Sequence, residues 1–278
     1  MASPETPRRL VVNADDFGRS HSINAAVVRA HREGILTTAS LMVNGAACDE
    51  AVALARENPR LGVGLHLTLV MGRASLSPAE IPGLVDVRGE FGDNAVASGF
   101  RYFFAGHGLR DQLHREIAAQ FAKFRATGLS LDHVNGHLNL HLHPTVFALL
   151  MEHAEEWGIR HLRLTRDPFW LNARLASGHW FYRVSHALIF NILSRRARGE
   201  LRRFGIRHTA RVFGLLQNGR VDEGFVMRLL SQLPVGDSEL YSHPSLDDFK
   251  QELDALLSPQ VKTLVAERGF QLIRYQDL

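Results

Sequence analysis

The chain has 278 residues, of which 45% are hydrophobic and 22% are charged, and its formal net charge is +3 at pH 7. This composition is ordinary for a globular protein, and the length is enough to bury a large core. No apolar run approaches the roughly 18 residues that a membrane-spanning helix needs. The single cysteine, Cys48, excludes an internal disulfide.

The first residues, "MASPETPRR", have no apolar segment after their charges, so we expect no secretory signal. Because a lone cysteine also fits a reducing compartment, we expect a cytoplasmic protein. The positive charge is concentrated in residues 183–207, which hold seven arginines and one glutamate. No stacking aromatic residues are interleaved with these arginines, so we expect no nucleic-acid partner.

Short apolar or alternating runs are predicted to form strands. In chain order they cover residues 9–14, 37–45, 61–69, 131–141, 159–167, 208–216, 237–245 and 270–278. Helical patterns separate several of them, at 22–34, 49–58, 109–128 and 143–158. Strands that alternate with helices indicate βαβ units and a parallel sheet. Seven or eight such strands favour a closed or nearly closed (β/α) barrel, and we expect one domain over residues 1–278.

Two stretches interrupt this alternation. Residues 71–108 are rich in glycine, proline and serine and carry scattered aromatic side chains. We expect them to form a long excursion over the mouth of the barrel that faces the substrate. Residues 168–207 form the second excursion, which is aromatic at its start and rich in arginine later.

Polar side chains stand at the ends of four predicted strands. They are Asp15, Asp16, His66, His137, His141 and His243. In parallel α/β folds the carboxyl ends of the strands meet at one rim, where active residues lie. Carboxylate oxygens and imidazole nitrogens are good ligands for a divalent ion such as zinc, manganese or magnesium. The pattern therefore predicts a metal site at this rim.

Each of these residues alone has a simpler explanation. Asp16 or Ser20 can cap the helix that begins near Ser22. His66 can be a hydrogen-bonded histidine of the core, and the histidines after Gly136 can lie on a surface loop. These explanations together require several coincidences at one rim, so the metal site is the stronger hypothesis.

Four motifs carry a resemblance to a known family. "VVNADDFG", "GVGLHLTL", "HVNGHLNLHLHP" and "ELYSHP", in that order, resemble the YdjC-like carbohydrate deacetylases. The resemblance covers residues from about 9 to 278 and is strongest with the hopanoid-biosynthesis-associated members, which act on an N-acetylglucosaminyl lipid. It implies a distorted (β/α) barrel of the polysaccharide-deacetylase type, with about seven or eight mostly parallel strands.

The resemblance also implies roles for particular residues. One divalent ion, magnesium first with zinc or manganese as alternatives, is expected to be held by Asp16, His66 and His137. Asp15 matches the general base of the family. His243 matches the histidine that assists the leaving group.

Three further residues are assigned to substrate binding, and they are Asn135, His141 and Arg163. His141 is also a candidate for a fourth contact to the metal. Asn135 stands where the family often has an aspartate, so the environment of His137 is expected to differ from the usual one. The expected reaction is hydrolysis of the acetamide of an N-acetylglucosaminyl substrate, with release of acetate. A hopanoid-linked sugar is the first expected substrate, and a chitooligosaccharide is the second.

Alternatives remain open on function and partners. A metal-dependent phosphoesterase uses similar residues on a similar barrel, and a carbohydrate-binding protein without activity is a further reading. Release of acetate or of phosphate separates the two enzymes. Residues 179–207 can form a basic amphipathic helix at an anionic membrane, or a helix packed on the barrel with a solvated arginine face. The family likeness also suggests a homodimer.

Overall fold

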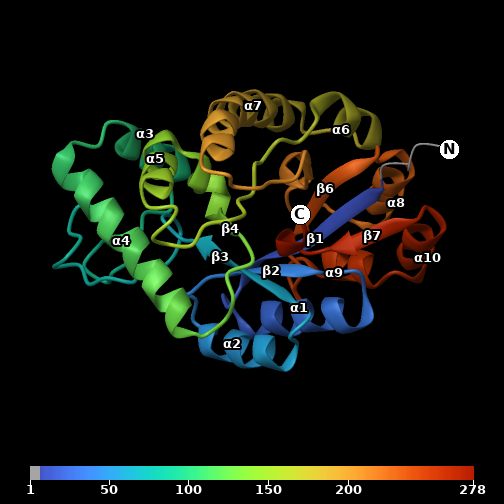
Figure 1. The fold of residues 1–278 in the computed structure, drawn as a ribbon, viewed down its shortest axis with the longest axis horizontal. Coiled ribbons are helices and arrows are strands. Elements are labelled where there is room, and N and C mark those ends of the chain that lie inside the picture. Colours follow the sequence, from blue (N-terminus) through green and yellow to red (C-terminus); the bar gives the residue numbers. More distant parts are fainter. Residues whose placement is uncertain (1–6) are drawn as a thin grey trace.

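The computed structural model describes residues 7–278, so most of the stretch in which we expect no secretory signal lies outside the described residues. The centre of the molecule is a curled parallel sheet surrounded by helices (Figure 1). The strands of the described part are β1 (Arg8–Phe17), β2 (Thr38–Leu41), β3 (Gly62–Leu67), β4 (Val134–Gly136), β5 (Arg211–Phe213), β6 (Gly236–Ser242) and β7 (Phe270–Ile273). The α/β fold with about seven mostly parallel strands is confirmed.

Strand β1 is the axis of the sheet. The strand order is β4-β3-β2-β1-β6-β5, and β7 pairs with β1 outside this path. One edge of β1 pairs with β6, while its other edge pairs first with β7 and then with β2. Residues 10–17 are all buried, because both faces of β1 are covered. Since every pairing is parallel, the carboxyl ends of these strands share one rim.

The predicted strand at 159–167 is not a continuous strand. It contributes two isolated bridges, Val134 to Leu162 and His161 to Arg207. The Val212 N–H also donates to the Arg166 carbonyl at 3.0 Å. The segment therefore lies between β4 and β5 and forms a few backbone hydrogen bonds with the residues on each side. The sheet curls towards a barrel without a full ladder at this point.

The predicted strand at 131–141 is much shorter in the structure. Strand β4 ends at Gly136, and a 3₁₀ segment, η1 (His137–Leu142), follows directly. Leu138 and Asn139 adopt left-handed backbone conformations, with φ of 50° and 57°. Such residues cannot continue a strand, so the chain turns at the point where the first histidine of the motif stands.

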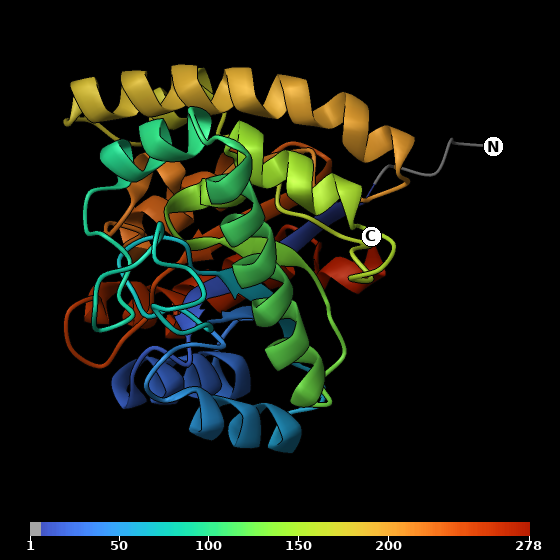
Figure 2. The same cartoon turned by 90° about the vertical axis from the view of Figure 1, so that its left-hand side faces the viewer.

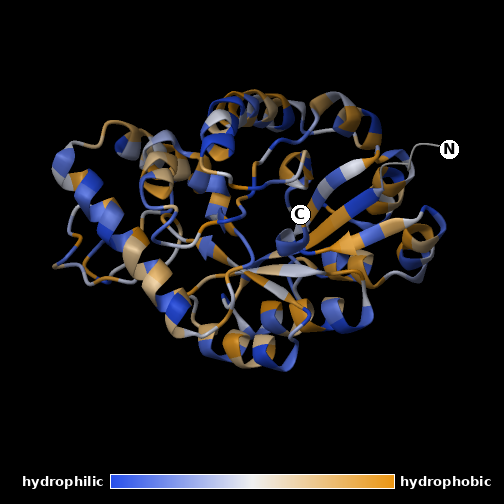
Figure 3. Cartoon of the chain, viewed as in Figure 1, coloured by the Kyte–Doolittle hydropathy of each residue, from blue (hydrophilic) through white to orange (hydrophobic). Residues whose placement is uncertain are grey.

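Helices cover the outside of the sheet. They are α1 (His21–Glu33), α2 (Cys48–Glu57), α3 (Ala95–Phe103), α4 (His107–Ala126), α5 (Pro144–Glu152), α6 (Phe169–Leu175), α7 (Trp180–Arg203), α8 (Glu223–Gln232), α9 (Lys250–Leu257) and α10 (Pro259–Glu267). Two short 3₁₀ segments complete the described chain, η2 (Leu215–Gln217) and η3 (Tyr275–Asp277). Apolar residues run through the central strands, while the outer helices alternate in polarity (Figure 3). None of the helices in residues 7–278 is long and apolar enough to cross a membrane.

The two excursions have different structures. Residues 71–108 begin as a loop and continue into α3, and they bury Phe91 and Tyr102 while Phe100 and Phe104 stay exposed. Residues 168–207 form α6 and α7. Figure 2 shows α7 lying along one side of the molecule, and α7 contacts α5, α6 and η1. Helix α7 is therefore connected to the turn that follows β4.

Candidate active site

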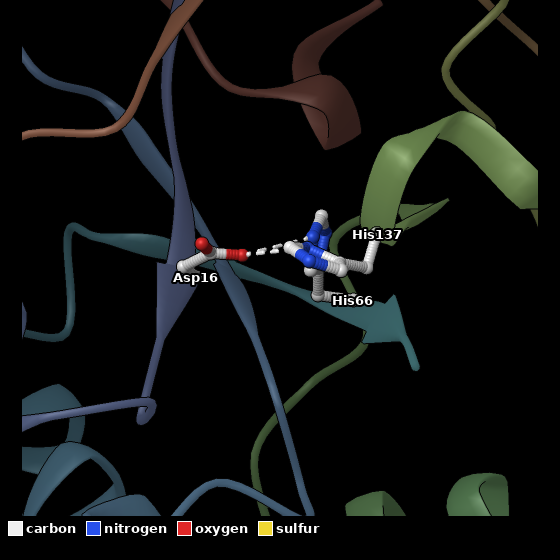
Figure 4. A group of neighbouring side chains, drawn as sticks. All are labelled: Asp16, His66 and His137. Carbon is white, nitrogen blue, oxygen red and sulfur yellow. Dashed lines mark hydrogen bonds and ion pairs between the residues drawn. The ribbon is translucent and has the colours of Figure 1, made fainter. Parts of the chain in front are cut away.

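Three side chains from three different strand ends meet at the rim. Asp16 stands near the end of β1, His66 on β3, and His137 at the start of η1 (Figure 4). Asp16 Oδ1 lies 3.3 Å from His66 Nε2 and 3.1 Å from His137 Nδ1. All three residues are buried, and one ligand atom from each lies within 4.8 Å of the others. The spacing is small enough for one ion to contact all three.

The backbone at Asp16 explains how adjacent aspartates reach different places. Asp16 has a left-handed backbone with φ of 65°, and the register between β1 and β2 shifts between Ala14 and Phe17. The side chains of Asp15 and Asp16 consequently diverge. A strained residue of this kind is typical of functional sites. The helix cap is Ser20, whose side chain accepts the Ile23 N–H, so capping does not explain Asp16.

The environment of His66 fits a bound cation. His66 Nδ1 lies 2.7 Å from Asn135 Oδ1, so Nδ1–H donates to Asn135 and Nε2 keeps its lone pair. This Nε2 is buried, has no hydrogen-bond partner within residues 7–278, and faces the Asp16 carboxylate. Two electron-rich atoms that face each other need a positive charge between them. The chemistry of the donor set, one carboxylate and two imidazoles, fits a divalent ion.

Electrostatics at the triad point the same way. Burial opposes the shift, but the hydrogen bond from His137 and the charges of His137 and His66 hold the pKa of the Asp16 carboxyl well below its usual range. Burial also opposes the shift at His66, where the Asp15 and Asp16 carboxylates raise the imidazole pKa. The site therefore stabilises positive charge at the position of His66 Nε2.

Asp15 is held on the other side of His66 by a bidentate arginine. Arg163 Nη1 donates to Asp15 Oδ2 at 2.6 Å, and Arg163 Nη2 donates to Oδ1 at 3.0 Å. Oδ1 also accepts hydrogen bonds from Asn13 at 2.8 Å and Asn135 at 3.0 Å. Burial raises the pKa of Asp15, but the charges of Arg163, His66 and His243, together with the Arg163 hydrogen bonds, outweigh burial and lower that pKa overall. Asp15 is thus ionised at neutral pH.

The Arg163 guanidinium is held in place by Glu239 and Tyr241. It donates to Glu239 Oε1 through Nε at 2.9 Å and Nη2 at 2.7 Å, and its guanidinium lies 4.2 Å from the Tyr241 ring centroid. The Tyr275 hydroxyl donates to the other Glu239 oxygen. All these groups are buried. Neither Glu239 nor Tyr275 was predicted from the sequence. The only signal for Glu239 is an acidic residue inside the apolar run of β6.

A second buried polar chain reaches Asp15 from β2. Ser40 Oγ accepts hydrogen bonds from Asn13 Nδ2 at 3.0 Å and Asn135 Nδ2 at 2.8 Å. Ser40 also lies 2.9 Å from His133 Nε2, and His133 Nδ1 lies 2.9 Å from Asp132 Oδ2. The asparagines that donate to Asp15 are fixed by this chain. Ser40 and His133 were not predicted from the sequence either.

The three residues assigned to substrate binding lie beneath the site. Asn135 and Arg163 have no exposed surface, and their side chains form hydrogen bonds with other protein groups. His141 is fully buried, and its Nε2 lies 2.9 Å from the Arg163 carbonyl. Burial lowers the pKa of His141 to about 3, so its ring is neutral. Complete burial favours a positioning role over contact with substrate, and His141 lies against Arg163 instead of joining the triad.

His243 stands directly after β6. Its backbone N–H donates to Glu252 Oε2 at 2.6 Å, and its Nδ1 lies 3.9 Å from the same oxygen. The His243 side chain is 18% exposed, which leaves it more open than the triad. The charge of His243 contributes to the lowered pKa of Asp15, so the two groups lie within Coulombic reach. The arrangement offers an ionised carboxylate and a partly exposed imidazole beside a candidate cation site.

Comparisons with known proteins agree with this geometry. The family model described as YdjC-like protein matches residues 9–267. A carbohydrate deacetylase of Geobacillus stearothermophilus is 31% identical over 276 residues, which cover 98% of each chain. A chitooligosaccharide deacetylase of Serratia marcescens is 31% identical over 281 residues, covering 97% of this chain and 98% of the relative.

A solved structure supports the fold. The crystal structure of an Enterococcus faecalis V583 protein named for cellobiose-phosphate cleavage matches with a TM-score of 0.74 at 22% identity. The match covers 98% of this chain and 99% of that protein. The curled parallel sheet is thus shared by both proteins.

Proposed function

Because the chain belongs to the YdjC-like family, we propose that it is a carbohydrate N-deacetylase that hydrolyses the acetamide of an N-acetylated amino sugar. The names of the Geobacillus and Serratia relatives support this activity. The observation that carries the proposal is the buried, unpartnered His66 Nε2 that faces Asp16, with ionised Asp15 on the other side of the imidazole. This arrangement suits hydrolysis of an unreactive amide.

The cofactor is proposed to be one divalent ion held by Asp16, His66 and His137, with magnesium first and zinc or manganese as alternatives. A divalent ion bound there would act as a Lewis acid, making water more acidic and the acetyl carbonyl more electrophilic. The hydrogen bond from His66 to Asn135 fixes the imidazole tautomer that presents Nε2 to the ion.

Asp15 is the proposed general base. Among the described residues, its Oδ1 accepts three hydrogen bonds, whereas its Oδ2 accepts only one, from Arg163. Oδ2 therefore keeps the capacity to accept a proton from the attacking water. The bidentate arginine orients the carboxylate, and it also makes Asp15 a weaker base than a free aspartate. A positioned base of this kind contributes roughly 10²–10⁴-fold to the rate.

His243 is the proposed proton donor to the leaving amine. The new bond forms between the water oxygen and the acetyl carbon, and the carbon–nitrogen bond breaks. The sugar nitrogen receives a proton from His243 and leaves as an amine, while acetate is released. The Glu252 hydrogen bond to the His243 backbone holds the residue at the strand end.

The substrate is proposed to be an N-acetylglucosaminyl compound, either a hopanoid-linked sugar or a chitooligosaccharide. The resemblance to hopanoid-associated members supports the first, and the Serratia relative supports the second. Peripheral membrane contact through residues 179–207 and a homodimer belong to the same proposal. A family match from residue 9 to 267 supports one domain over the chain.

Acetate release tests the function directly. We expect acetate from diacetylchitobiose, and loss of one acetyl group from an N-acetylglucosaminyl hopanoid by mass spectrometry. Chelation should abolish both, and separate addition of magnesium, manganese or zinc should identify the ion that restores turnover. Release of phosphate from an aryl phosphate, without acetate release from either sugar, would instead establish the phosphoesterase alternative.

A further inference from the structure

Helix α7 carries an outward face that is apolar at one end and basic at the other. Its exposed apolar residues recur every three or four positions and therefore share one side of the helix. They are Phe181, Val184, Leu188 and Ile192, with Ile189 beside them. Phe181 is 89% exposed and Leu188 is 61% exposed. The same side continues into exposed arginines towards the carboxyl end, Arg195 and Arg202.

No other element of residues 7–278 covers this face in either ribbon view (Figures 1 and 2). The opposite side of α7 is buried against the body of the protein through Arg183, Ser194, Ala197 and Leu201. An exposed apolar row of this size on a surface helix marks a binding surface. The helix is already anchored, so the row is not needed for packing within the chain.

A groove runs between α6 and α7 beside this row. It has a volume of about 420 Å³, and its apolar wall includes Trp170, Val184 and Leu188. Trp170 is 79% exposed, which is unusual for so large an apolar side chain. Arg166 and Arg195 also line the groove. Asp167 lines the groove too, but it is buried and accepts hydrogen bonds from Asn172 and the Leu216 N–H. The groove thus combines apolar walls with two arginines that do not pair with this carboxylate.

These cations belong to a larger arginine cluster, made of Arg166, Arg195, Arg198 and Arg211. Burial and repulsion by the other three arginines lower the pKa of Arg166. Arg198 Nε is shielded from solvent and has no hydrogen-bond partner in the described part of the chain. Within residues 7–278 none of the four forms an ion pair.

Some arginines elsewhere on the surface do have carboxylate partners. Arg29, Arg110 and Arg115 each pair with a carboxylate on the same or a neighbouring helix. Gathering four like charges that pair with no carboxylate of residues 7–278 is unfavourable, so the cluster suits an anion supplied from outside. Guanidinium groups bind phosphate groups well.

We propose that the outer face of α7, together with Trp170 and the arginine cluster, docks on a membrane that contains anionic phospholipids. The arginines bind lipid phosphates, and the apolar residues enter the interfacial layer, as in other basic amphipathic helices. A second copy of this chain fits less well. A second copy would need carboxylates to pair with these arginines, but Glu200 is the only acidic residue between residues 183 and 207. Its carboxylate already lies 3.5 Å from Arg203.

Docking has a consequence that rests on the proposed function. Ser194 Oγ on the inner side of α7 donates to the Thr165 carbonyl at 2.9 Å. Thr165 Oγ1 in turn donates to Asn139 Oδ1 at 2.8 Å, within the turn that carries His137. The docked helix would therefore hold the candidate active site near the membrane surface, where the sugar of a lipid-linked substrate lies.

Vesicle co-sedimentation of the full chain tests the docking. We expect binding to phosphatidylcholine vesicles containing phosphatidylglycerol, and little binding to phosphatidylcholine alone. Raising the salt from about 0.1 M to about 1 M shortens the Debye length from about 10 Å to about 3 Å and should release much of the protein. Arg195→Gln with Arg198→Gln should weaken binding about thirtyfold, since each surface arginine contributes about fivefold.

A second pair of variants tests the apolar half. Leu188→Ser with Ile192→Ser should weaken binding at both salt concentrations, because the apolar contribution is not screened. The control pair is Val87→Ser with Arg115→Gln, an exposed apolar residue and an exposed arginine elsewhere on the surface, and it should bind as the wild type does. All variants should release acetate from diacetylchitobiose at the wild-type rate, which shows that they fold.

Three outcomes would overturn the docking proposal. One is no binding to anionic vesicles at low salt. Another is wild-type binding by both α7 pairs. The third is a lipid-free dimer that Leu188→Ser with Ile192→Ser dissociates, because a second copy would then cover the face. Binding is measured without turnover, so a protein that docks but releases no acetate refutes the proposed deacetylase activity and leaves the docking proposal standing.

Discussion

Arg163 and Arg166 lie three residues apart on the segment between β4 and β5, yet they meet opposite surroundings. Arg163 is fully buried and donates to two carboxylates, those of Asp15 and Glu239. Arg166 is exposed, lines the groove beside α7, and has other arginines as its neighbours. One short segment therefore supports both the floor of the candidate site and the edge of the proposed docking face.

The contrast shows how the same residue type serves two purposes. A buried ion pair adds little net stability compared with apolar packing, but it fixes the groups that it joins. Arg163 can therefore orient Asp15. Unpaired surface arginines fix nothing within the chain and remain available for an external anion. Substitutions that separate orientation from stability can test this difference.

The largest expected effect is on catalysis. Asp15→Asn should lower the rate of acetate release by about 10²–10⁴-fold, because the variant cannot accept the proton from water. Metal content, measured by mass spectrometry of the purified protein, should stay as in the wild type. His66→Ala with His137→Ala should lose the metal instead. Wild-type turnover in Asp15→Asn would remove Asp15 from the role of base.

The next effect is on stability. Arg163→Met should destabilise the fold by about 3–5 kcal/mol in urea unfolding at neutral pH, because it leaves the Asp15 and Glu239 carboxylates buried without a counterion. Arg166→Met is the matched control and should change stability by about 0.5 kcal/mol or less, as expected of an exposed residue without an ion pair. Equal losses in the two variants would contradict the contrast between them.

The residues at the rim of the candidate site were predicted better from the sequence than the buried polar residues that support them, which we call the floor of the site. Asp16, His66 and His137 each follow an apolar run, so the parallel-sheet rule places them together without knowledge of the loops. The strand at 131–141 was predicted too long, because nothing in its alternating pattern reveals that Leu138 would adopt a left-handed backbone. The turn is what separates His137 from His141.

The floor could not be predicted for a different reason. Glu239 and Tyr275 are 36 residues apart, and both reach Arg163 only through the pairing of β6 and β7 with β1. Arg163 itself sits in a segment whose strand pattern the structure does not complete. Partner choice among buried polar residues depends on tertiary register, which local patterns do not encode.

The buried carboxylates of Asp15 and Asp167 differ in pKa, and this difference predicts how stability depends on pH. Arg163 lowers the pKa of Asp15, whereas burial without a hydrogen-bonded cation raises the pKa of Asp167 to about 7. Asp167 accepts the Leu216 N–H at 3.1 Å. The native state therefore holds a proton that the unfolded state releases between about pH 4 and pH 7, and stability falls as the pH rises through this window.

Asp167→Asn should remove this dependence. The amide resembles the protonated acid, so the variant should be more stable than the wild type by about 2–4 kcal/mol at pH 8 and similar to it at pH 4. Thermal unfolding at both pH values measures the difference. A gain of the same size at pH 4 would show that the effect has no connection with ionisation of Asp167.

The smallest effect concerns Tyr275, the last residue in the series of buried hydrogen-bonded groups that runs from Asp15 through Arg163 and Glu239. Tyr275→Phe removes the hydroxyl that donates to Glu239 and leaves a buried carboxylate oxygen without this donor, at a cost of about 1–3 kcal/mol. If the chain orients Asp15 through Arg163, kcat should also fall while KM changes little. Tyr182→Phe, which removes a hydroxyl bound to the Leu215 carbonyl at 3.1 Å beside α7, is the matched control. A loss of stability in Tyr275→Phe with wild-type kcat would mean that Glu239 supports the fold and leaves the orientation of Asp15 to Arg163 and the asparagines.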